Sequence, residues 1–419
     1  MNVVYSLFME LSTRILPILG VFVPKIRHFL APRKNLFASL TDFRAAHPGP
    51  LTWFHVASLG EYEQAKPVIA ALKAKEPEIW IAVSFFSPSG YEPTSRKPQA
   101  GVDYITYLPL DRQSWAERFV GVLQPTRSIF VKYDLWHHHL QALKRRQVPT
   151  YLIAASFRPD QSYFSWYGSF FHRMLLQMDW IFTQNEASIQ LLANLNITNA
   201  SHTGDTRFDR VAGTAAQPLD FPAIKNWIQG RPTVVIGSAW EEDMSLLIPL
   251  IQSKPEFLWI IAPHAMDAVA MDRWASALEI SSQKYSQWNA AQDSQVLFID
   301  NIGMLSFLYQ FAQFAYVGGG FGKGLHNILE PLGFGIPVIF GNPRSASKFP
   351  EAAQSQLEGC GFAVSSFSEL QECVTNLEQP EFYTKSAASA QRWVKANLGA
   401  ADRILVHLTT SISSKWKDE

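Results

Sequence analysis

Short apolar runs that alternate with helical stretches, in two successive series, constrain the fold of this chain more than any other feature. The first series comprises Leu51–Val56, Ile79–Ser84, Tyr104–Leu108, Ser128–Lys132, Thr150–Ala154 and Trp180–Thr183. Such runs, bounded by turn residues, are typical of parallel strands that are buried on both faces of a sheet. We therefore predict a Rossmann-like, doubly wound α/β domain over residues 36–216, with its last strand at Trp180–Thr183.

A second series begins after a proline-containing stretch, Gln217–Pro222, which we interpret as a linker. Its runs are Thr233–Ser238, Leu258–Ala262, Val296–Ile299, Phe314–Val317 and Pro337–Phe340. This pattern predicts a second Rossmann-like domain over residues 217–419, whose last helix can return to the first domain. Ligands of such folds bind at the carboxyl ends of the strands, so we expect a cleft between the two domains.

The composition fits two globular domains. The chain has 419 residues, of which 47% are hydrophobic, so two sizeable cores can form. Only 17% are charged, below the usual quarter, which argues against a disordered chain and suggests extra buried or membrane-facing surface. The formal net charge is zero, so no global field gathers nucleic acid. The only cysteines, Cys360 and Cys373, lack metal-ligand spacing and fit a reducing compartment.

Residues 1–35 form a separate apolar segment followed by basic residues. Met1–Val23 carries large apolar side chains at roughly helical spacing, interrupted by Glu10 and Arg14. The charged pair near the middle disfavours a membrane-spanning helix. In a signal peptide the positive charge precedes the apolar run, whereas here it follows. We expect either an interfacial helix on anionic lipid, with Lys25–Lys34 as a basic collar, or an amphipathic helix packed on the protein.

Two candidate motifs end strands of the first series. Ser58-Leu-Gly-Glu61 follows the first run and opens a helix, and Gly60 allows a tight turn or a close backbone approach. Glu61 is either a general base or an acid favoured by the helix dipole. Lys132 and Asp134 lie at the end of a later run and either line the cleft or form an ion pair with each other at the surface. The three histidines after Trp136 are adjacent and point in different directions on a helix, so we predict no metal site there.

Three more loops supply candidate anion contacts. Arg207, in Gly204-Asp-Thr-Arg-Phe-Asp209, is either an anion contact or part of a structural loop. Ser238, in Gly237-Ser-Ala-Trp240, precedes an acid-rich first helical turn; such a helix end binds phosphate unless the acids already satisfy it. Pro263 and His264 end the next strand.

The strongest motif is the glycine-rich stretch Val317-Gly-Gly-Gly-Phe-Gly-Lys-Gly-Leu-His-Asn-Ile-Leu-Glu-Pro331. Its backbone can approach a ligand closely, and its N–H groups can form an anion nest. A helix carrying Glu330 follows His326 and Asn327, an arrangement typical of nucleotide binding. The stretch lacks the Gly-Lys-Ser/Thr ending of a P-loop. We therefore assign nucleotide binding to Gly319, Gly320, Lys323, His326, Asn327 and Glu330, with a flexible structural loop as the alternative.

These segments, in this order, resemble the Kdo transferases, a family of GT-B glycosyltransferases. Ser58–Glu61 is similar to the family's Ser-Val-Gly-Glu, and Gly318–Pro331 to its Gly-Gly-(x)n-Gly-His-Asn-x-x-Glu-Pro. Gly204–Asp209 resembles Gly-Asn-Leu-Lys-Phe-Asp, with Arg207 in place of the lysine. Asp134 stands where glutamate is usual, and the Pro-Arg-His loop lacks its arginine here, as Pro263-His264.

The resemblance implies a GT-B fold and an inverting transfer of Kdo from CMP-Kdo to a lipid A precursor at the cytoplasmic face of the bacterial inner membrane. In this interpretation Glu61 is the base, Ser58, Gly60, Lys132 and Asp134 line the acceptor cleft, and Arg207, Ser238, Pro263, His264 and the glycine-rich stretch hold the donor. No metal and no other cofactor is expected, and Arg207, Lys132 and Lys323 are candidates for the Kdo carboxylate.

Two rival functions remain open at this point. One is another GT-B enzyme that uses a UDP-sugar, either a lipid-linked transferase or an epimerase. The other is a non-catalytic, membrane-docking protein with a decayed nucleotide pocket, against which the presence of Glu61, Asn327 and Glu330 speaks.

Overall fold

The chain folds into two compact units in a computed structural model that describes residues 2–290, 292–322, 324–344 and 348–415. The first unit comprises Met1–Arg210 and Gly399–Glu419, and the second comprises Val211–Leu398. The division falls inside one helix, α10 (Thr206–Ala216), a little before the sequence-based boundary at residue 216. The irregular stretch that we interpreted as a linker follows it at residues 217–221.

The first unit is an α/β domain preceded by three N-terminal helices. In chain order its elements are α1 (Asn2–Phe22), α2 (Pro24–Leu30), η1 (Ala31–Arg33), α3 (Leu36–Ala46), β1 (Leu51–Val56), α4 (Leu59–Lys75), β2 (Trp80–Phe85), α5 (Pro88–Ser95), β3 (Tyr104–Tyr107), α6 (Gln113–Leu123), β4 (Arg127–Val131), α7 (His137–Arg145), β5 (Thr150–Ala155), η2 (Ser162–Phe164), α8 (Ser169–Leu175), β6 (Trp180–Thr183), α9 (Glu186–Ala193), β7 (Ala200–His202), and the late helix α19 (Ala400–Lys415).

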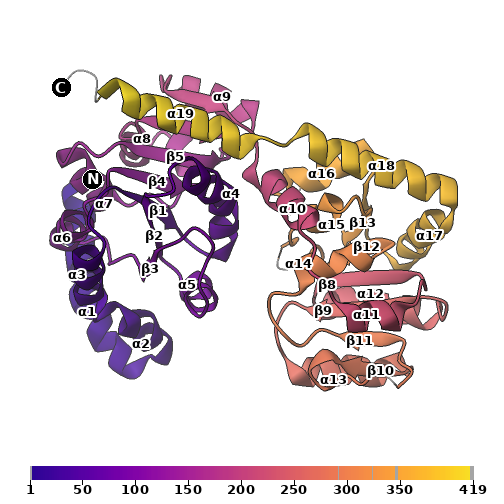
Figure 1. Ribbon diagram of the computed structural model, residues 1–419. Coiled ribbons are helices and arrows are strands. Elements are labelled where there is room, and N and C mark those ends of the chain that lie inside the picture. The colour runs from indigo at the N-terminus through magenta and orange to yellow at the C-terminus, as the bar shows by residue number, and fades with distance from the viewer. Residues whose placement is uncertain (1, 291, 323, 345–347, 416–419) are drawn as a thin grey trace. The chain divides into compact units, whose positions relative to one another are not determined.

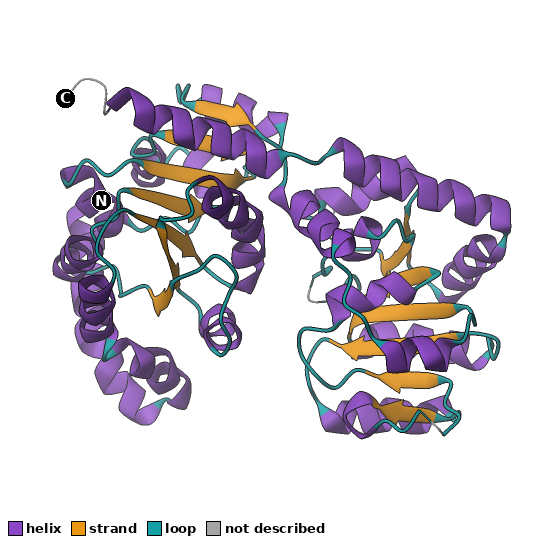
Figure 2. Ribbon diagram, in the orientation of Figure 1, coloured by secondary structure: helices purple, strands orange, loops and turns teal. Residues whose placement is uncertain are grey.

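Its seven strands form one parallel sheet (Figure 1 and Figure 2). Their order is β3-β2-β1-β4-β5-β6-β7. Alternate side chains of each strand enter different cores because successive residues of a strand point to opposite faces. Trp53 lies in a core with α3, α6 and α7, whereas Phe54 lies in a core with α4 and α19. Both residues are fully buried, which explains why the strands read as continuous apolar runs rather than alternating ones.

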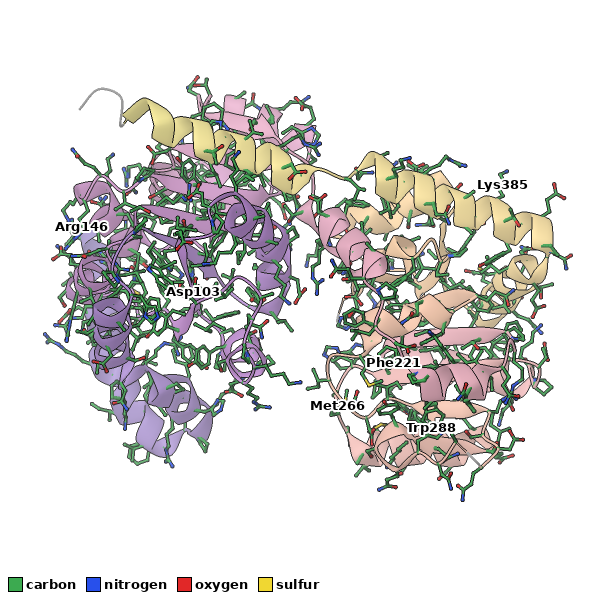
Figure 3. All side chains as sticks on the ribbon, in the orientation of Figure 1. Asp103, Arg146, Phe221, Met266, Trp288 and Lys385 are labelled. Carbon is green, nitrogen blue, oxygen red and sulfur yellow. The ribbon has the colours of Figure 1, made fainter. Side chains whose placement is uncertain are left out.

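The second unit repeats the doubly wound plan. Its elements are α11 (Pro222–Ile228), β8 (Thr233–Ala239), α12 (Glu241–Gln252), β9 (Leu258–Pro263), α13 (Ala268–Leu278), β10 (Ser282–Lys284), η3 (Tyr285–Gln287), β11 (Val296–Phe298), α14 (Leu305–Leu308), η4 (Tyr309–Phe311), β12 (Phe314–Val317), α15 (Leu329–Gly333), β13 (Val338–Gly341), α16 (Pro350–Glu358), β14 (Gly361–Val364), α17 (Phe367–Glu378) and α18 (Pro380–Ala396). Its parallel sheet has the order β10-β11-β9-β8-β12-β13-β14. Side chains fill the space between each sheet and its helices (Figure 3).

The predicted strands are confirmed to within a residue or two at their ends, but each series was incomplete. Trp180–Thr183 is not the last strand of the first sheet, because β7 pairs with it in parallel. The second sheet has two further strands, β10 and β14. All three missed strands lie at sheet edges and have only three or four residues, and β7 and β10 are polar, so no apolar run marks them.

The last described helix belongs to the first unit. Helix α19 packs against α4, and its Ile404 and Leu408 are buried in the core that contains Phe54. Asp209 holds its N-terminus, because the backbone N–H groups of Gly399 and Ala401 donate to the two Asp209 carboxylate oxygens at 2.6 and 2.8 Å. The chain therefore leaves the first unit near Arg210 and returns to it at Gly399.

The N-terminal helix α1 packs on the first unit by one side and exposes the other. Tyr5 donates to the buried Asp111 at 2.6 Å, and Glu10 pairs with Arg112 at 2.7 Å. Met9 is buried, whereas the opposite side carries exposed large apolar residues, among them Leu7, Phe8, Leu11 and Ile18. Helix α1 is long and apolar enough to cross a membrane by length and composition, and little of it is buried. Helix α1 therefore packs on the first unit by one side and presents an apolar face to solvent on the other.

Candidate functional site

In the first unit, the candidate residues gather at the carboxyl ends of β1 and β4. These neighbouring strands lie where the strand order reverses, since β1 continues to β2 on one side and pairs with β4 on the other. The helices that follow them, α4 and α7, pack in different cores of this unit, and ligands of doubly wound folds bind at such an edge. Ser58 and Glu61 follow β1, and Lys132 and Asp134 follow β4, so the topology brings together two motifs that are some seventy residues apart in the sequence.

The two carboxylate oxygens of Glu61 have different surroundings, which bear on its two predicted roles, an acid at a helix start and a general base. Ser58 is the N-cap of α4, and its backbone N–H donates to Glu61 Oε2 at 3.1 Å, with a further hydrogen bond from its hydroxyl to the same oxygen. This is a capping box, so Glu61 does stabilise the helix start. Its other oxygen, Oε1, faces Lys132 Nζ at 3.7 Å, and both side chains are partly exposed. A general-base role for that oxygen stays a prediction.

Lys132 holds its position at a conformational cost. Its φ is 62°, in the left-handed region that non-glycine residues rarely occupy, and its backbone N–H donates to Ile153 O at 2.9 Å. Backbone strain of this kind persists where the surrounding structure fixes it, and it gathers at functional sites. The turn at Lys132 directs its ammonium group to Glu61 rather than to the solvent.

Asp134 ends a buried hydrogen-bonded chain that the sequence did not reveal. His55 Nε2 lies 2.9 Å from Asp134 Oδ2, and His55 Nδ1 lies 2.9 Å from Ser84 Oγ. The Trp53 indole N–H also donates to Ser84 Oγ, at 2.8 Å. Because indole can only donate, the serine hydroxyl hydrogen is left for His55 Nδ1, and Nε2–H then donates to the carboxylate. His55 and Ser84 are fully buried. A polar residue inside an apolar strand was the one signal for them.

Gly60 and Arg207 do less for this site than their motifs suggested. A Cβ atom at Gly60 would meet only Ser58 Oγ, at 3.9 Å, so the fold itself does not require glycine there. The Arg207 guanidinium pairs with Asp205 through Nε at 2.9 Å and Nη2 at 2.7 Å. Its charge is therefore already compensated by a carboxylate, and any anion would have to compete with Asp205.

The segment around Arg207 is also a structural junction in the first unit. Thr206 donates to Gln64 O of α4 at 2.8 Å, and Arg210 pairs with Glu63 of α4 at 2.7 Å. Asp209 caps α19 as described above. The structural reading of this loop is therefore well supported, and a ligand contact by Arg207 stays a prediction.

The three adjacent histidines serve the packing of α7. Asp111 is buried and accepts the backbone N–H groups of His138 and His139, each at 3.0 Å, as well as His139 Nδ1 at 2.6 Å. Burial alone would raise the pKa of Asp111, but these donors and Tyr5 lower it to about 2. Asp111 is thus an ionised helix cap. Among the described residues, no group of three potential ligands has the geometry of a metal site.

In the second unit, the candidate loops likewise meet at the reversal of strand order, between β8 and β12. Asp243, in the first turn of α12, fastens them together. Its Oδ2 accepts the N–H groups of Trp240 at 3.0 Å and Gly319 at 2.9 Å, and its Oδ1 accepts the Tyr316 hydroxyl at 2.9 Å. The side chain is fully buried, and burial raises its pKa. An acid therefore does satisfy this helix end, as the acid-rich first turn allowed.

Three successive glycines of the loop after β12, Gly318, Gly319 and Gly320, are required by the fold. A Cβ at Gly318 would lie 2.4 Å from Ser238 O, and one at Gly320 would lie 1.9 Å from Gly341 O. Gly319 has a φ of 93° and its carbonyl accepts the N–H of Gly324 at 3.1 Å. Ser238 itself is left-handed, with a φ of 53°. The N–H of Gly319 donates to Asp243 and the N–H of Gly324 donates to the Gly319 carbonyl. These two N–H groups therefore do not form the anion nest that we predicted.

Three aromatic rings stack beside this loop. His264, which follows Pro263 at the end of β9, stacks on Trp240 with ring centroids 4.1 Å apart and lies 4.4 Å from His326. The Trp240 indole N–H donates to His326 Nε2 at 3.1 Å. This bond requires an unprotonated Nε2, and burial together with His264 lowers the pKa of His326 to about 4. The neutral ring then carries its hydrogen on Nδ1 and can donate it.

Asn327 and Glu330 lie together at the start of α15. Asn327 Oδ1 accepts the N–H of Leu329 at 3.2 Å, and its Nδ2 lies 3.3 Å from Glu330 Oε1. Lys323, the remaining candidate of this loop, lies outside the described residues. The second unit thus brings together Ser238, Pro263, His264, Gly319, Gly320, His326, Asn327 and Glu330, and the first unit brings together Ser58, Gly60, Glu61, Lys132 and Asp134.

Comparison with known proteins gives this arrangement a family context. A model described as "3-Deoxy-D-manno-octulosonic-acid transferase (kdotransferase)" matches residues 32–210. A 3-deoxy-D-manno-octulosonic acid transferase of Rickettsia felis is 26% identical over 313 residues, which span 72% of this chain and 66% of that protein. One of Haemophilus influenzae is 26% identical over 404 residues, 93% of this chain and 92% of its own length.

Solved structures with similar architecture include a glycosyltransferase of Rickettsia africae, with a TM-score of 0.56 and 10% identity over 87% of this chain and 99% of that one. At this identity the likeness concerns the fold alone, which is the GT-B arrangement of two parallel α/β sheets.

Proposed function

We propose that this chain, which is similar to the Kdo transferases over residues 32–210 and along most of its length, is a glycosyltransferase of that family that moves Kdo from CMP-Kdo to a lipid A precursor with inversion at the anomeric carbon. The observation that carries the proposal is the position of Glu61, whose Oε1 lies at the reversal point of the first sheet and faces Lys132 Nζ at 3.7 Å. The product would be a Kdo-bearing precursor of lipopolysaccharide.

Glu61 is proposed to act as the general base. The acceptor hydroxyl oxygen attacks the anomeric carbon, the bond between that carbon and the phosphate oxygen of CMP breaks, and the hydroxyl proton passes to Glu61 Oε1. The transition state is oxocarbenium-like, as in glycoside chemistry generally. Ser58 keeps the other carboxylate oxygen occupied, which fixes the orientation of Oε1.

CMP-Kdo is assigned to the second unit. The neutral His326 can donate through Nδ1 to a phosphate oxygen, and the stacked rings of Trp240 and His264 offer an aromatic surface beside it. Asn327 and Glu330 would hold the hydroxyl groups of the nucleotide. We infer that CMP leaves without a metal, because hydrogen-bond donors can absorb the growing charge. Full activity in the presence of EDTA would support this, and its loss with recovery on adding Mg²⁺ would refute it.

A cation is needed for the Kdo carboxylate. Lys132 is the stronger of the two described candidates, since Arg207 is already paired with Asp205. Lys132 lies 3.7 Å from Glu61 Oε1, so a substrate carboxylate that draws its ammonium group away would leave Glu61 a better base.

The cytoplasmic face of the inner membrane is the proposed location. The exposed apolar side of α1 suits a lipid surface, and the exposed cations Lys25 and Lys34 suit anionic headgroups, whereas Arg27 and Arg33 donate to backbone carbonyls. Flotation of the whole chain with anionic vesicles, and its loss when Leu7 and Phe8 are replaced by serine, would support this placement. Unchanged flotation of that variant would exclude α1 as the attachment.

The decisive experiment is incubation with CMP-Kdo and a tetraacylated lipid A precursor, followed by mass measurement of the lipid product. We expect a mass increase of one or more Kdo units with the natural chain, and none with Glu61→Ala, which should still bind CMP. Glu61→Asp is the matched control for charge. If Glu61→Ala transfers at the natural rate, Glu61 is not the base.

The rival function is a UDP-sugar enzyme of the same fold. Parallel incubations with UDP-sugars in place of CMP-Kdo separate the two, because only one class of donor should be consumed. Turnover of a UDP-sugar without turnover of CMP-Kdo would replace the proposal.

A further inference from the structure

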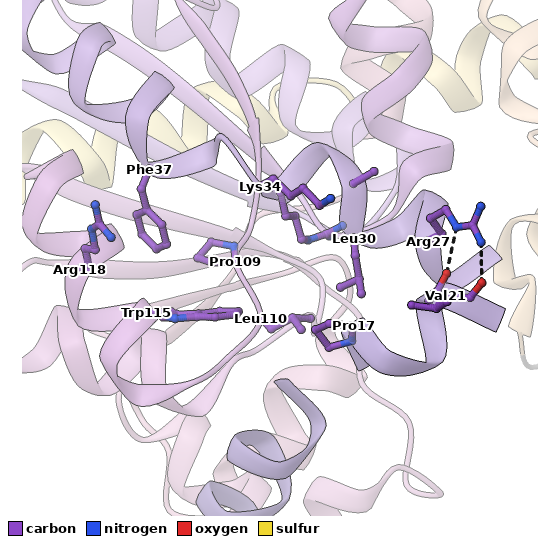
Figure 4. A pocket seen from close by; sticks show the side chains of 13 residues that line it. Pro17, Val21, Arg27, Leu30, Lys34, Phe37, Pro109, Leu110, Trp115 and Arg118 are labelled. Carbon is purple, nitrogen blue, oxygen red and sulfur yellow. Dashed lines mark hydrogen bonds between the residues drawn. The ribbon is translucent and has the colours of Figure 1, made fainter. Parts of the chain in front are cut away.

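A cavity of about 600 Å³ opens in the first unit (Figure 4), and none of the residues assigned above to the reaction lines it. Helices α1, α2 and α3 form one side of it, and the segment from Pro109 to Arg118 forms the other. Its volume is that of an ordinary small-molecule site. The lining residues are Pro17, Gly20, Val21, Arg27, Leu30, Ala31, Arg33, Lys34, Phe37, Pro109, Leu110, Trp115 and Arg118.

Apart from four cations and the Trp115 indole, the lining side chains carry no hydrogen-bonding group. A sugar or a peptide backbone would therefore lose its hydrogen bonds to water without replacement. A hydrocarbon chain has no such bonds to lose, and its burial is favourable in proportion to the area removed from water. The lining thus selects for a hydrocarbon ligand.

Two of the four cations are part of the protein framework. Arg27 donates to the carbonyls of Gly20 at 3.0 Å and Val21 at 2.5 Å, so it holds the C-terminal end of α1. Arg33 donates to Leu108 O at 3.0 Å and Phe86 O at 2.6 Å, and burial lowers its pKa to about 10. Their donors are engaged with backbone oxygens.

The other two cations, Lys34 and Arg118, are exposed where the cavity meets solvent. Arg118 lies over the Phe37 ring at 4.4 Å. Across residues 2–290, 292–322, 324–344 and 348–415, neither side chain has an acidic partner within ion-pair distance. Two uncompensated positive charges beside an apolar cavity complement an anionic group on an apolar ligand.

Helix α1 joins this cavity to the exposed apolar face of the same helix. Pro17, Gly20 and Val21 line the cavity, while Ile18 and Phe22 are 62% and 78% exposed. A lipid chain that enters along α1 would pass from one apolar surface to another.

From this geometry we propose that the cavity binds one acyl chain of a phosphate-bearing lipid, with Lys34 and Arg118 holding the phosphate. The inference deepens the proposed function and rests on it for its biological meaning, because an acylated, phosphorylated glycolipid acceptor has this chemistry. The binding itself requires neither CMP-Kdo nor Glu61.

The test measures binding of hexyl, octyl, decyl and dodecyl phosphate to the full chain by calorimetry, each below its micelle concentration and with no donor present. We expect affinity to rise about fourfold for each added methylene group until the cavity is full. Inorganic phosphate should not bind measurably. Affinity that does not change with chain length would overturn the proposal.

Two matched variants locate the binding. Ala31→Phe fills the cavity and should abolish the dependence on chain length, whereas Ala38→Phe, on the exposed side of α3, should keep it. If both variants behave like the natural chain, the alkyl chains bind elsewhere, for example on the open face of α1, and the proposal fails. Circular dichroism of both variants checks that they are folded.

A third variant tests the phosphate contact. Replacing both Lys34 and Arg118 by glutamine should weaken decyl phosphate binding at least tenfold and leave decyl glucoside binding unchanged. Equal losses of affinity for decyl phosphate and decyl glucoside would show that Lys34 and Arg118 do not bind the phosphate group. These binding tests do not measure transfer, so their outcome is independent of the transfer assay. A chain that binds alkyl phosphates as expected but does not transfer Kdo would support this site and refute only the proposed function.

Discussion

His55 Nε2 lies 2.9 Å from Asp134 Oδ2, although 79 residues separate the two in the chain. The histidine is fully buried on β1, and the aspartate follows β4 at the edge of the proposed acceptor site. His55 is therefore a positioning residue: it fixes the Asp134 carboxylate and is itself fixed by Ser84. Any role of Asp134 in binding substrate depends on this buried chain.

Replacing His55 by alanine should lower the free energy of unfolding of the first unit by about 2 kcal/mol, because Ser84 and Asp134 lose a partner. It should also raise KM for the lipid acceptor more than it lowers kcat. His55→Gln retains a side-chain amide that can donate to Asp134 and should recover most of the acceptor affinity. Urea unfolding and steady-state transfer kinetics measure the two effects. Equal KM values for all three proteins would exclude the positioning role.

Substitutions of Lys132 should affect stability and transfer activity differently. Lys132→Gly removes both the cation and the strain of the left-handed backbone, whereas Lys132→Ala removes the cation alone. The glycine variant should therefore be about 1 kcal/mol more stable than the alanine variant. Both should lose transfer activity to a similar extent. Thermal unfolding with parallel activity assays tests this, and an active glycine variant would show that the ammonium group is dispensable.

The lowered pKa of His326 predicts a specific pH dependence. The unfolded chain takes up a proton on this ring near its ordinary pKa of 6.5, whereas the folded ring stays neutral down to about 4. The unfolded state then binds more protons between these values, so stability falls as pH drops from 6.5 toward 4. His326→Gln, which can still accept from Trp240, should show a smaller loss of stability between pH 7 and pH 5. An identical loss in both proteins would contradict the assignment.

Asp209→Ala should loosen α19 by about 1 kcal/mol or more, since two backbone N–H groups lose their shared acceptor. Asp209→Asn keeps one acceptor oxygen and should have a smaller effect. Amide hydrogen exchange resolves the location of the change. Faster exchange should appear in α19 and the facing part of α4, with β8 and β9 of the second unit unchanged as an internal control.

The sequence predicted the fold well because its strands are buried on both faces and therefore stand out as apolar runs. Strand β7, Ala200–His202, was missed because it is an edge strand with polar side chains and has no apolar run. The positions of Glu61 and Lys132 were predicted for the same reason, as both directly follow central strands.

The contacts of the site were less predictable because they join distant parts of the chain. Asp243 looked like one acid among three at a helix start, yet it alone reaches Gly319 and Tyr316, more than seventy residues later. His55 and Ser84 gave only the weak signal of a polar residue in an apolar strand. The sequence left Arg207 open between an anion contact and a structural loop, because its pairing with Asp205 depends on local backbone geometry.

The return of α19 to the first unit has a consequence for how the protein is made. The first unit contains residues 1–210 but is completed only when Gly399 and the helix after it have left the ribosome. The second unit is continuous, so it can finish folding while its neighbour still exposes the side of α4 that α19 will cover. A nascent chain of this protein therefore leaves apolar side chains of α4 uncovered from the completion of residue 210 until α19 emerges after residue 399. Premature termination near residue 398 would damage the half that was translated first.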